Sequence, residues 1–402
     1  MSLRCPGRGP FLVVAFIGCL ALHGVGAEAS TAIWPQFRGP NGSGVSTSAH
    51  PPVKIGPTNA VLWSVEVPWS PSSPCIWGER IFLTTFDRGE LQTRCYNTED
   101  GSVLWQKGVK PEKLEAYHKT ENSPAAPTPA TDGQHVVSYF GSFGLVCYGM
   151  LGAEIWRHPL PVALSGGGFG TGTSPIIAGK LIVLDRDQDQ NSSLVAVDAA
   201  TGKTAWEAPR PDATGSFGTP IIWRNAGAQE VVVPGCLWLK GYDLKTGEED
   251  WMAEGMAAFS CTTPVVGADW LFFAGWSPGK TDSPWPPWDS FLERFDKNNH
   301  GEIAFDEFPE SDRDFMSGLD ANHDGKITKA DWDIILARNA KGRNVMVAIK
   351  PGGRGDITQT HIAWEFTRGL PYVASPLFYE GRIYLISIWQ EWGDEGIGIG
   401  FY

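Results

Sequence analysis

A short residue pattern that recurs along this chain limits its fold more than any other feature of the sequence. The pattern is D-x-x-T-G-x-x-x-W; it is complete at residues 198–206 and 243–251, and weaker copies end at Trp105 and Trp156. Asp and Gly at this spacing favour a tight turn, because the carboxylate accepts backbone N–H groups and Gly tolerates a positive φ. The flanking residues predict a short strand on either side of the turn. The closing Trp offers a rigid face on which the neighbouring copy can pack.

A second recurring motif begins with Ser/Thr-Pro and runs into alternating apolar residues. Its six copies are Ser73-Pro74, Thr128-Pro129, Ser174-Pro175, Thr219-Pro220, Thr263-Pro264 and Ser375-Pro376. Proline is tolerated as the first residue of a strand, because its missing N–H is not needed there. Most copies continue through a Gly into a second apolar segment. Each copy therefore predicts the start of a strand hairpin.

The spacing of this second motif predicts the architecture. From Pro to Pro the intervals are 55, 46, 45, 44 and 112 residues. The first four are close to the length of a four-stranded propeller blade, and the two motifs alternate in the same phase. We therefore predict an all-β fold, a β-propeller of about seven four-stranded blades formed by residues 33–280 and 341–402. Residues 281–340 fill the long interval and are predicted to be a small α-helical insertion.

The end of the chain does not follow the repeat. After Ile386 the phase requires another D-x-x-T-G-x-x-x-W copy, which the sequence lacks. We expect the last part of the propeller to be truncated, and whether the ring is complete stays open. The segment ending at Trp63 could supply an outer strand to that last part, since propellers usually close with strands from both ends of the chain.

The N-terminal residues 1–27 are typical of a signal peptide. Arg4 and Arg8 precede an apolar stretch over 11–22, and small residues follow at the expected cleavage position. The stretch is too short for a comfortable membrane span, and no later segment is long and apolar enough for one. We expect an exported protein, periplasmic or extracellular. Lipidation at Cys19 stays open.

Charge and cysteine content exclude two classes of protein. The net charge is −13, and residues 281–337 hold 14 acidic against 5 basic residues, so this stretch of the insertion alone carries −9. Without a basic stripe, nucleic-acid binding is not expected.

The five cysteines after the signal segment have no regular spacing, so they do not indicate a disulfide framework. Cys95 and Cys147 share one motif position and are expected to be small buried strand residues.

The insertion contains two twelve-residue loops with the pattern D-x-[DN]-x-[DN]-G, at 296–307 and 320–331. Calcium needs six to eight oxygens, from side chains at positions 1, 3, 5 and 12 and a carbonyl at position 7, with Gly at position 6. The carbonyls would come from Glu302 and Lys326. The candidate metal ligands are Asp296, Asn298, Glu302, Glu307, Asp320, Asn322, Asp324, Lys326 and Asp331.

These two loops resemble an EF-hand pair. The resemblance implies that Ile303 and Ile327 pair as a short β-bridge, with helices near 290–295 and 332–337. Two departures weaken it. His300 stands where the first loop needs an oxygen, and Asp331 is shorter than the Glu usual at position 12. A weak calcium site, a magnesium site, and an acidic surface insertion without metal remain alternatives.

The copy at 196–206 resembles the PQQ-like repeat of quinoprotein-type propellers. Residues 34–44 and 348–356 resemble exported bacterial members of that family, and the resemblance covers roughly 33–386. The family contains dehydrogenases that hold PQQ and calcium on the propeller axis. It also contains propellers without chemistry, such as the periplasmic scaffold of the outer-membrane barrel-assembly machinery.

This chain lacks features of the enzyme branch. It has no adjacent Cys-Cys, no haem signature C-x-x-C-H and no obvious set of axial calcium ligands. We expect a non-catalytic binding or scaffold module with calcium-binding loops and protein partners at one propeller face, and we assign no catalytic or PQQ-binding residues. The alternative is a PQQ-dependent oxidoreductase of the alcohol or sugar dehydrogenase type. A third is a polysaccharide-binding surface protein, given 18 tryptophans.

Two further segments invite a functional interpretation. The Gly-rich stretch 166–172 leads into a strand instead of a helix, so we interpret it as a loop between blades and not as a phosphate loop. The acidic stretch 185–189 could contact a cation, but solvated loop charge is the favoured interpretation.

Overall fold

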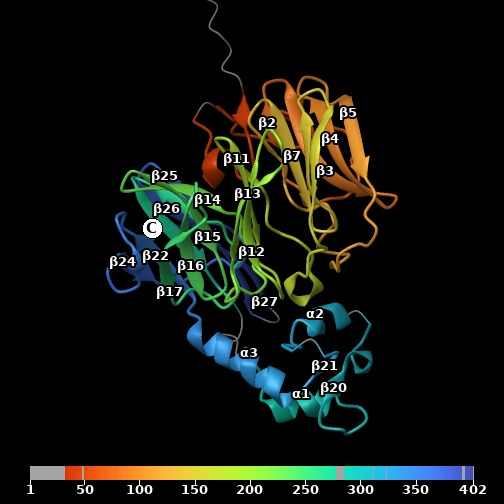
Figure 1. Cartoon of the computed structure of the whole chain (residues 1–402), viewed down its shortest axis with the longest axis vertical. Coiled ribbons are helices and arrows are strands. Elements are labelled where there is room, and N and C mark those ends of the chain that lie inside the picture. The colour runs from red at the N-terminus through yellow and green to blue at the C-terminus, as the bar shows by residue number, and fades with distance from the viewer. Residues whose placement is uncertain are drawn as a thin grey trace, which may run out of the picture. The chain divides into compact units, whose positions relative to one another are not determined.

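The computed structural model describes residues 32–47, 49–277, 285–310, 312–322, 324–391 and 394–401. The predicted signal segment and Cys19 lie outside this range. Consecutive strands pair into consecutive antiparallel sheets, as Figure 1 shows. No helix among the described residues is long and apolar enough to cross a membrane.

The first three sheets follow one another along the chain. The first contains β1 (Ile33–Trp34), β2 (Cys75–Trp77), β3 (Arg80–Asp87), β4 (Glu90–Asn97) and β5 (Val103–Val109). The second contains β6 (Ala130–Thr131), β7 (His135–Phe140), β8 (Gly144–Gly149) and β9 (Glu154–Pro159). The third contains β10 (Ile176–Ala178), β11 (Leu181–Arg186), β12 (Ser193–Asp198) and β13 (Thr204–Pro209).

The remaining three sheets complete the series. The fourth contains β14 (Ile221–Asn225), β15 (Ala228–Pro234), β16 (Trp238–Asp243), β17 (Glu249–Glu254) and the short parallel strand β23 (Gly355–Asp356). The fifth contains β18 (Val265–Gly267), β19 (Trp270–Gly275), β22 (Val345–Ile349) and β24 (Ile362–Phe366). The sixth contains β25 (Leu377–Tyr379), β26 (Arg382–Glu391) and β27 (Asp394–Phe401), three strands where the repeat has four.

The Ser/Thr-Pro motif starts the first strand of every repeat, as predicted. It also links the sheets, because the backbone N–H of each Ser or Thr donates to the hydroxyl of the next copy. The five bonds are Ser73–Thr128 (3.0 Å), Thr128–Ser174 (3.0 Å), Ser174–Thr219 (3.1 Å), Thr219–Thr263 (3.2 Å) and Thr263–Ser375 (2.9 Å). Among the described residues no hydrogen bond joins Ser375 back to Ser73, so this series is open.

The D-x-x-T-G-x-x-x-W motif joins the third and fourth strands of a sheet and docks on its neighbour. The indole of Trp156 donates to the carbonyl oxygen of Ala199 at 2.8 Å. Its ring leaves no room beside Gly202, where an added Cβ would lie 2.5 Å from the ring. Gly202 also has φ +68°, which only glycine adopts freely. The predicted docking of each Trp on the next copy is confirmed here.

The same contact recurs at two other copies, whereas the indole of Trp251 donates to the Glu230 carboxylate of its own sheet. The indoles of Trp105 and Trp206 donate to the carbonyl oxygens of Met150 and Leu244 in the next sheet. Trp63 makes an equivalent bond of 2.8 Å to the carbonyl oxygen of Thr98 in the first sheet. Residues 61–67 therefore have the docking Trp of an outermost strand, although they form no strand themselves.

A separate apolar core fills each space between consecutive sheets. Val136 belongs to the core between the first and second sheets, and Val137 to the core between the second and third. Because successive strand residues point to opposite faces, both faces of the middle sheets are buried. Cys95 and Cys147 lie in these cores and are fully buried, as predicted.

The N-terminal residues 33–44, which include the 3-10 turn η1 (Pro40–Gly42), run across the first strands of several sheets. β1 pairs with β2, and the carbonyl oxygen of Pro35 accepts the N–H of Thr131 in β6. The Asn41 amide exchanges two hydrogen bonds with Ile222 in β14. Arg38 donates to the carbonyl oxygen of Pro376, next to β25, at 2.6 Å. This segment thus ties together parts of the chain more than 300 residues apart.

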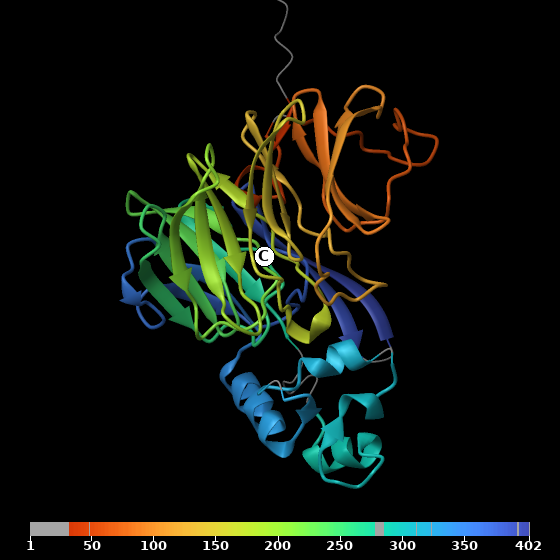
Figure 2. The same cartoon turned by 45° about the vertical axis from the view of Figure 1, so that its right-hand side comes forward.

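The insertion lies between β19 and β22 of the fifth sheet. It contains α1 (Trp288–Phe295), β20 (Ile303–Ala304), the 3-10 turn η3 (Phe305–Glu307), α2 (Arg313–Ser317), β21 (Lys326–Ile327) and α3 (Lys329–Lys341). Figures 1 and 2 show these helices and short strands grouped together. Phe291, Phe308 and Trp332 belong to a core of their own. A second 3-10 turn, η2 (Gly166–Gly168), lies in the loop between the second and third sheets, which confirms the inter-blade interpretation.

Candidate metal centre and buried charge cluster

The first candidate loop begins directly after α1. Its carboxylate at position 1, Asp296, accepts the backbone N–H groups of His300 (3.2 Å) and Gly301 (2.9 Å). The bond from Gly301 lowers the pKa of Asp296. The carboxylate at position 12, Glu307, accepts the N–H groups of Lys297 (2.8 Å) and Ala304 (2.8 Å). Both acidic ends of the loop are therefore turned toward its centre by backbone donors.

The second loop has the same geometry. Asp320 accepts the N–H groups of Asp324 (3.2 Å) and Gly325 (2.9 Å), and the Asn322 amide oxygen accepts the same Asp324 N–H at 2.9 Å. Gly325 has φ +92°, which the sharp turn at position 6 requires. At position 12, one oxygen of Asp331 accepts from the N–H and hydroxyl of Thr328 and so caps α3.

The two loops are joined where the sequence predicted. Ile303 pairs with Ile327 in the antiparallel bridge between β20 and β21, and both side chains are fully buried. At position 7 the side chains of Glu302 and Lys326 form an ion pair of 2.6 Å with each other. Only the backbone carbonyls of these two residues are thus available to a metal. The helices α1 and α3 lie where they were expected.

The donor set fits a hard cation in the second loop better than in the first. The other Asp331 oxygen is buried and has no hydrogen-bond partner, and the whole residue is 1% exposed. Such an orphaned acceptor is free to coordinate an ion. His300 offers the first loop no oxygen at position 5. Within the described residues, no three His, Cys, Asp or Glu side chains converge as a metal site.

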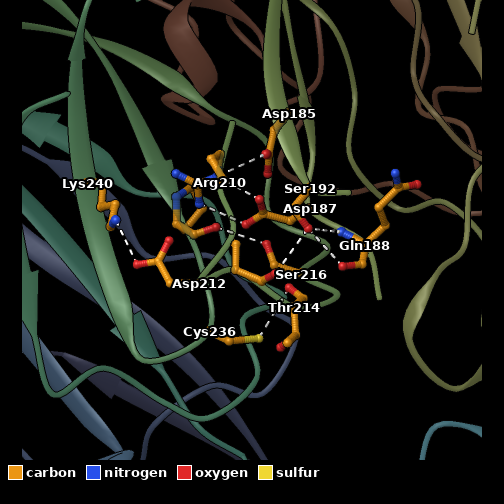
Figure 3. Close-up of polar contacts among 12 residues, drawn as sticks. Asp185, Asp187, Gln188, Ser192, Arg210, Asp212, Thr214, Ser216, Cys236 and Lys240 are labelled. Carbon is orange, nitrogen blue, oxygen red and sulfur yellow. Dashed lines mark hydrogen bonds and ion pairs between the residues drawn. The ribbon is translucent and has the colours of Figure 1, made fainter. Parts of the chain in front are cut away.

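A second polar site lies at the end of β11, where sequence reasoning expected solvated charge. That interpretation is wrong: Asp185 and Asp187 are buried. Arg210, from the loop after β13, donates to the two oxygens of Asp187 at 2.6 and 2.8 Å, and its Nε lies 3.8 Å from Asp185 (Figure 3). Arg210 also donates to the Tyr242 hydroxyl at 2.5 Å. No motif surrounds Arg210, so the sequence carried no sign of this pairing.

Glu115 is another buried carboxylate, and it bonds to Thr171 in the loop between the second and third sheets. One oxygen of its carboxylate accepts the N–H and the hydroxyl of Thr171, while the other has no partner. Burial raises the pKa of Glu115 to about 7, and the Thr171 bonds and the charge of Arg186 only partly oppose this.

Two hollows occur among the described residues near these elements. A cavity of about 20 Å³ is lined by the loop 170–173, Asp185 and their neighbours. An open groove of about 470 Å³ is lined by Asn41, Ile222, Arg224, Gln229 and Asp269, with further residues of the third to fifth sheets.

Comparison with known proteins agrees with the repeat. Residues 87–263 match the family model described as outer membrane protein assembly factor BamB. The match spans the second and third sheets with parts of the first and fourth. No curated protein matches the chain.

Solved structures of two kinds resemble the chain. BamB from Moraxella catarrhalis is 14% identical, with a TM-score of 0.44, over 82% of this chain and 73% of its own. The quinohemoprotein alcohol dehydrogenase of Comamonas testosteroni is 11% identical, with a TM-score of 0.46, over 90% and 77%. The quinohemoprotein alcohol dehydrogenase ADHIIG of Pseudomonas putida HK5 is 13% identical, with a TM-score of 0.44, over 78% of this chain but only 55% of its own.

Proposed function

We propose that this chain is an exported, non-catalytic β-propeller scaffold that binds other proteins and carries a pair of calcium-binding EF-hand loops. The observation that carries the scaffold role is the match of 87–263 to a family described as an outer membrane protein assembly factor.

The propeller itself is part of the proposal. The Ser/Thr hydrogen bonds join six sheets in sequence order, and the closing residues Trp105, Trp156 and Trp206 dock on the following sheet. Trp63 makes that docking contact from the segment that connects β1 to β2. We infer that residues 61–67 occupy the outermost position of the last blade, in a ring of about seven four-stranded blades.

Exposed apolar side chains support a protein partner. Leu62 is 90% exposed, and Val53, Ile55 and Trp69 in the same stretch are also exposed. These side chains are close in sequence, and an exposed apolar patch in a soluble protein is typical of an interaction site. The open groove of about 470 Å³ beside Asn41 is a second surface at which we propose that a protein partner binds.

The calcium proposal rests on the second loop. Asp320, Asn322 and Asp324, with the Lys326 carbonyl and Asp331, provide the oxygen types that calcium prefers. When bound, the ion would supply positive charge that holds the loop and the start of α3 together. In the first loop Asp296, Asn298, the Glu302 carbonyl and Glu307 would do the same with one oxygen ligand fewer.

Two titrations test this function. Calorimetric titration of calcium into the full chain should show saturable binding, and replacing Asp320 by Asn should remove the second-loop site from it. PQQ is then titrated in saturating calcium, with tryptophan fluorescence as the readout. A scaffold predicts no saturable quenching at tens of micromolar PQQ, whereas binding near one equivalent would replace it with the PQQ-dependent oxidoreductase. An unchanged number of calcium sites in Asp320→Asn would place the second ion elsewhere.

A further inference from the structure

The carboxylate of Asp185 lacks a partner that its surroundings require. The residue is fully buried, and neither oxygen has a hydrogen-bond partner. The guanidinium of Arg210 is 3.8 Å away but makes its two short bonds to Asp187. A buried acceptor left without a bond is unfavourable by about 1–3 kcal/mol, and more when it is charged. The geometry thus leaves a place for something that Asp185 can bind.

The charges around Asp185 do not balance. Asp185 and Asp187 carry two negative charges and Arg210 carries one positive charge, which leaves a net charge of −1. Arg186 also lines the cavity, but its charge interacts with that of Glu115. The other titratable groups near the cluster, Tyr139, Tyr242 and Cys236, have pKa values raised by burial and stay neutral. One more positive charge would neutralise the cluster.

The cavity beside Asp185 has room for one small species. It measures about 20 Å³, and about 10–15 Å³ suffices for a water molecule. Thr173 also lines it, and the hydroxyl of Thr173 is buried without a hydrogen-bond partner. This second orphaned oxygen comes from the loop before β10, whereas Asp185 belongs to β11. Two independent groups therefore lack a partner at the same cavity.

We propose that this cavity binds one dehydrated monovalent cation of the size of sodium or potassium, held between the Asp185 carboxylate and the Thr173 hydroxyl. A single positive charge balances the cluster. A divalent ion usually takes several carboxylates, and no set of three His, Cys, Asp or Glu side chains converges among the described residues. A proton alone would balance the charge, but it would leave the Thr173 hydroxyl without a partner.

The proposal makes cation binding depend on pH. Without the cation, burial and the negative charge of Asp187 raise the pKa of Asp185 well above its ordinary value. The cation and a proton therefore compete for the same carboxylate. Cation affinity is expected to fall as the pH falls, and the bound cation stabilises the fold because it binds only the folded chain.

Thermal unfolding of the full chain in different chlorides tests the proposal. Sodium, potassium and tetramethylammonium chloride are compared at equal ionic strength and constant saturating calcium, so that the calcium loops contribute equally. Sodium or potassium should raise Tm saturably, and tetramethylammonium, which is too large for the cavity, should not. Equal Tm values in all three salts, with a Tm that rises only on acidification, would overturn the proposal in favour of a shared proton.

Two variants and a control locate the effect. Asp185→Asn should abolish the dependence of Tm on the cation. Thr173→Val keeps the shape and should raise the half-saturating concentration roughly tenfold, the effect of one lost polar contact. Asp212→Asn removes the acid that pairs with Lys240 outside the cavity and should leave the response unchanged. If Asp185→Asn does not fold, Thr173→Val decides: an unchanged half-saturating concentration would refute the site.

Discussion

At the scale of single residues, we expect pH and ions to act on this protein through three buried carboxylates. Glu115, Asp185 and Asp331 each have at least one buried oxygen without a hydrogen-bond partner. The sequence did not indicate the burial of these three carboxylates equally well. Asp331 was expected from the spacing of its loop, Asp185 was interpreted as solvated, and Glu115 was not singled out, because no motif contains it.

Glu115→Gln should flatten the pH dependence of stability. The folded pKa of about 7 lies above the ordinary value of 4.5, so the folded chain binds more protons between these two pH values. The free energy of unfolding of the native protein should therefore fall by roughly 3 kcal/mol as pH rises through that window, with no further loss above it.

Urea unfolding of both proteins at pH 5 and pH 8 measures the difference. Gln can still accept the bonds from Thr171 and carries no charge. The exposed Glu112 in the same segment provides the control, since Glu112→Gln should keep the native pH dependence. A native-like pH dependence in Glu115→Gln would show that this carboxyl is ionised throughout the window.

Asp331→Asn should weaken calcium binding to the second loop about tenfold or more. The change removes the negative charge at position 12 but leaves an oxygen that can still accept from Thr328 and cap α3. Calorimetric calcium titration measures it. Asp333→Asn in the same helix is the control, because Asp333 is exposed and pairs only with Lys329 in the described contacts. Equal weakening by both changes would indicate a general charge effect instead of coordination.

At the scale of elements, each of the first three sheets contacts the next through one Trp and one glycine turn. Trp156 is 8% exposed and docks on the following sheet. Trp364 closes the fifth sheet at the same motif position but is 41% exposed and packs mainly on Phe272 of its own sheet. The motif alone does not distinguish these two residues.

Trp156→Ala should therefore lower the free energy of unfolding by about 3–5 kcal/mol, the usual effect of removing a buried aromatic side chain. Trp364→Ala should cost clearly less, because its side chain already contacts water. Chemical denaturation of both variants measures the two losses in the free energy of unfolding. Equal losses would mean that docking between sheets contributes little beyond ordinary burial.

At the scale of the whole molecule, the N-terminal residues 33–44 hold distant sheets together. Arg38 bonds to its own loop at Gly42 and to Pro376 beside β25. Burial lowers the pKa of Arg38 to about 10, so the side chain stays charged at neutral pH. The segment also reaches the first, second and fourth sheets, but no described hydrogen bond links it to the third.

Arg38→Ala should loosen the sixth sheet selectively. The loss of charged hydrogen bonds should lower stability by about 1.5–3 kcal/mol. Amide hydrogen exchange should quicken in β25 and the start of β26, while β10 to β13 of the third sheet keep their protection. Faster exchange in all sheets alike would show that the segment stabilises the fold globally instead of tying one sheet.

The sequence by itself determined the repeat, and with it the strands, the turns and the order of the sheets. That was possible because turn chemistry and strand starts depend on neighbouring residues such as Asp198, Gly202 and Pro220, which lie close together in the chain. It also placed the two acidic loops and the bridge between Ile303 and Ile327.

Tertiary structure alone decided which polar residues are buried and what they meet. Arg210 reaches Asp187 across 23 residues, Thr171 reaches Glu115 across 56, and Arg38 reaches Pro376 across 338. Such pairs form only when separate sheets come together, and no local pattern records them. Burial then decides whether a carboxylate such as Asp185 is an ordinary solvated charge or a group that needs a partner.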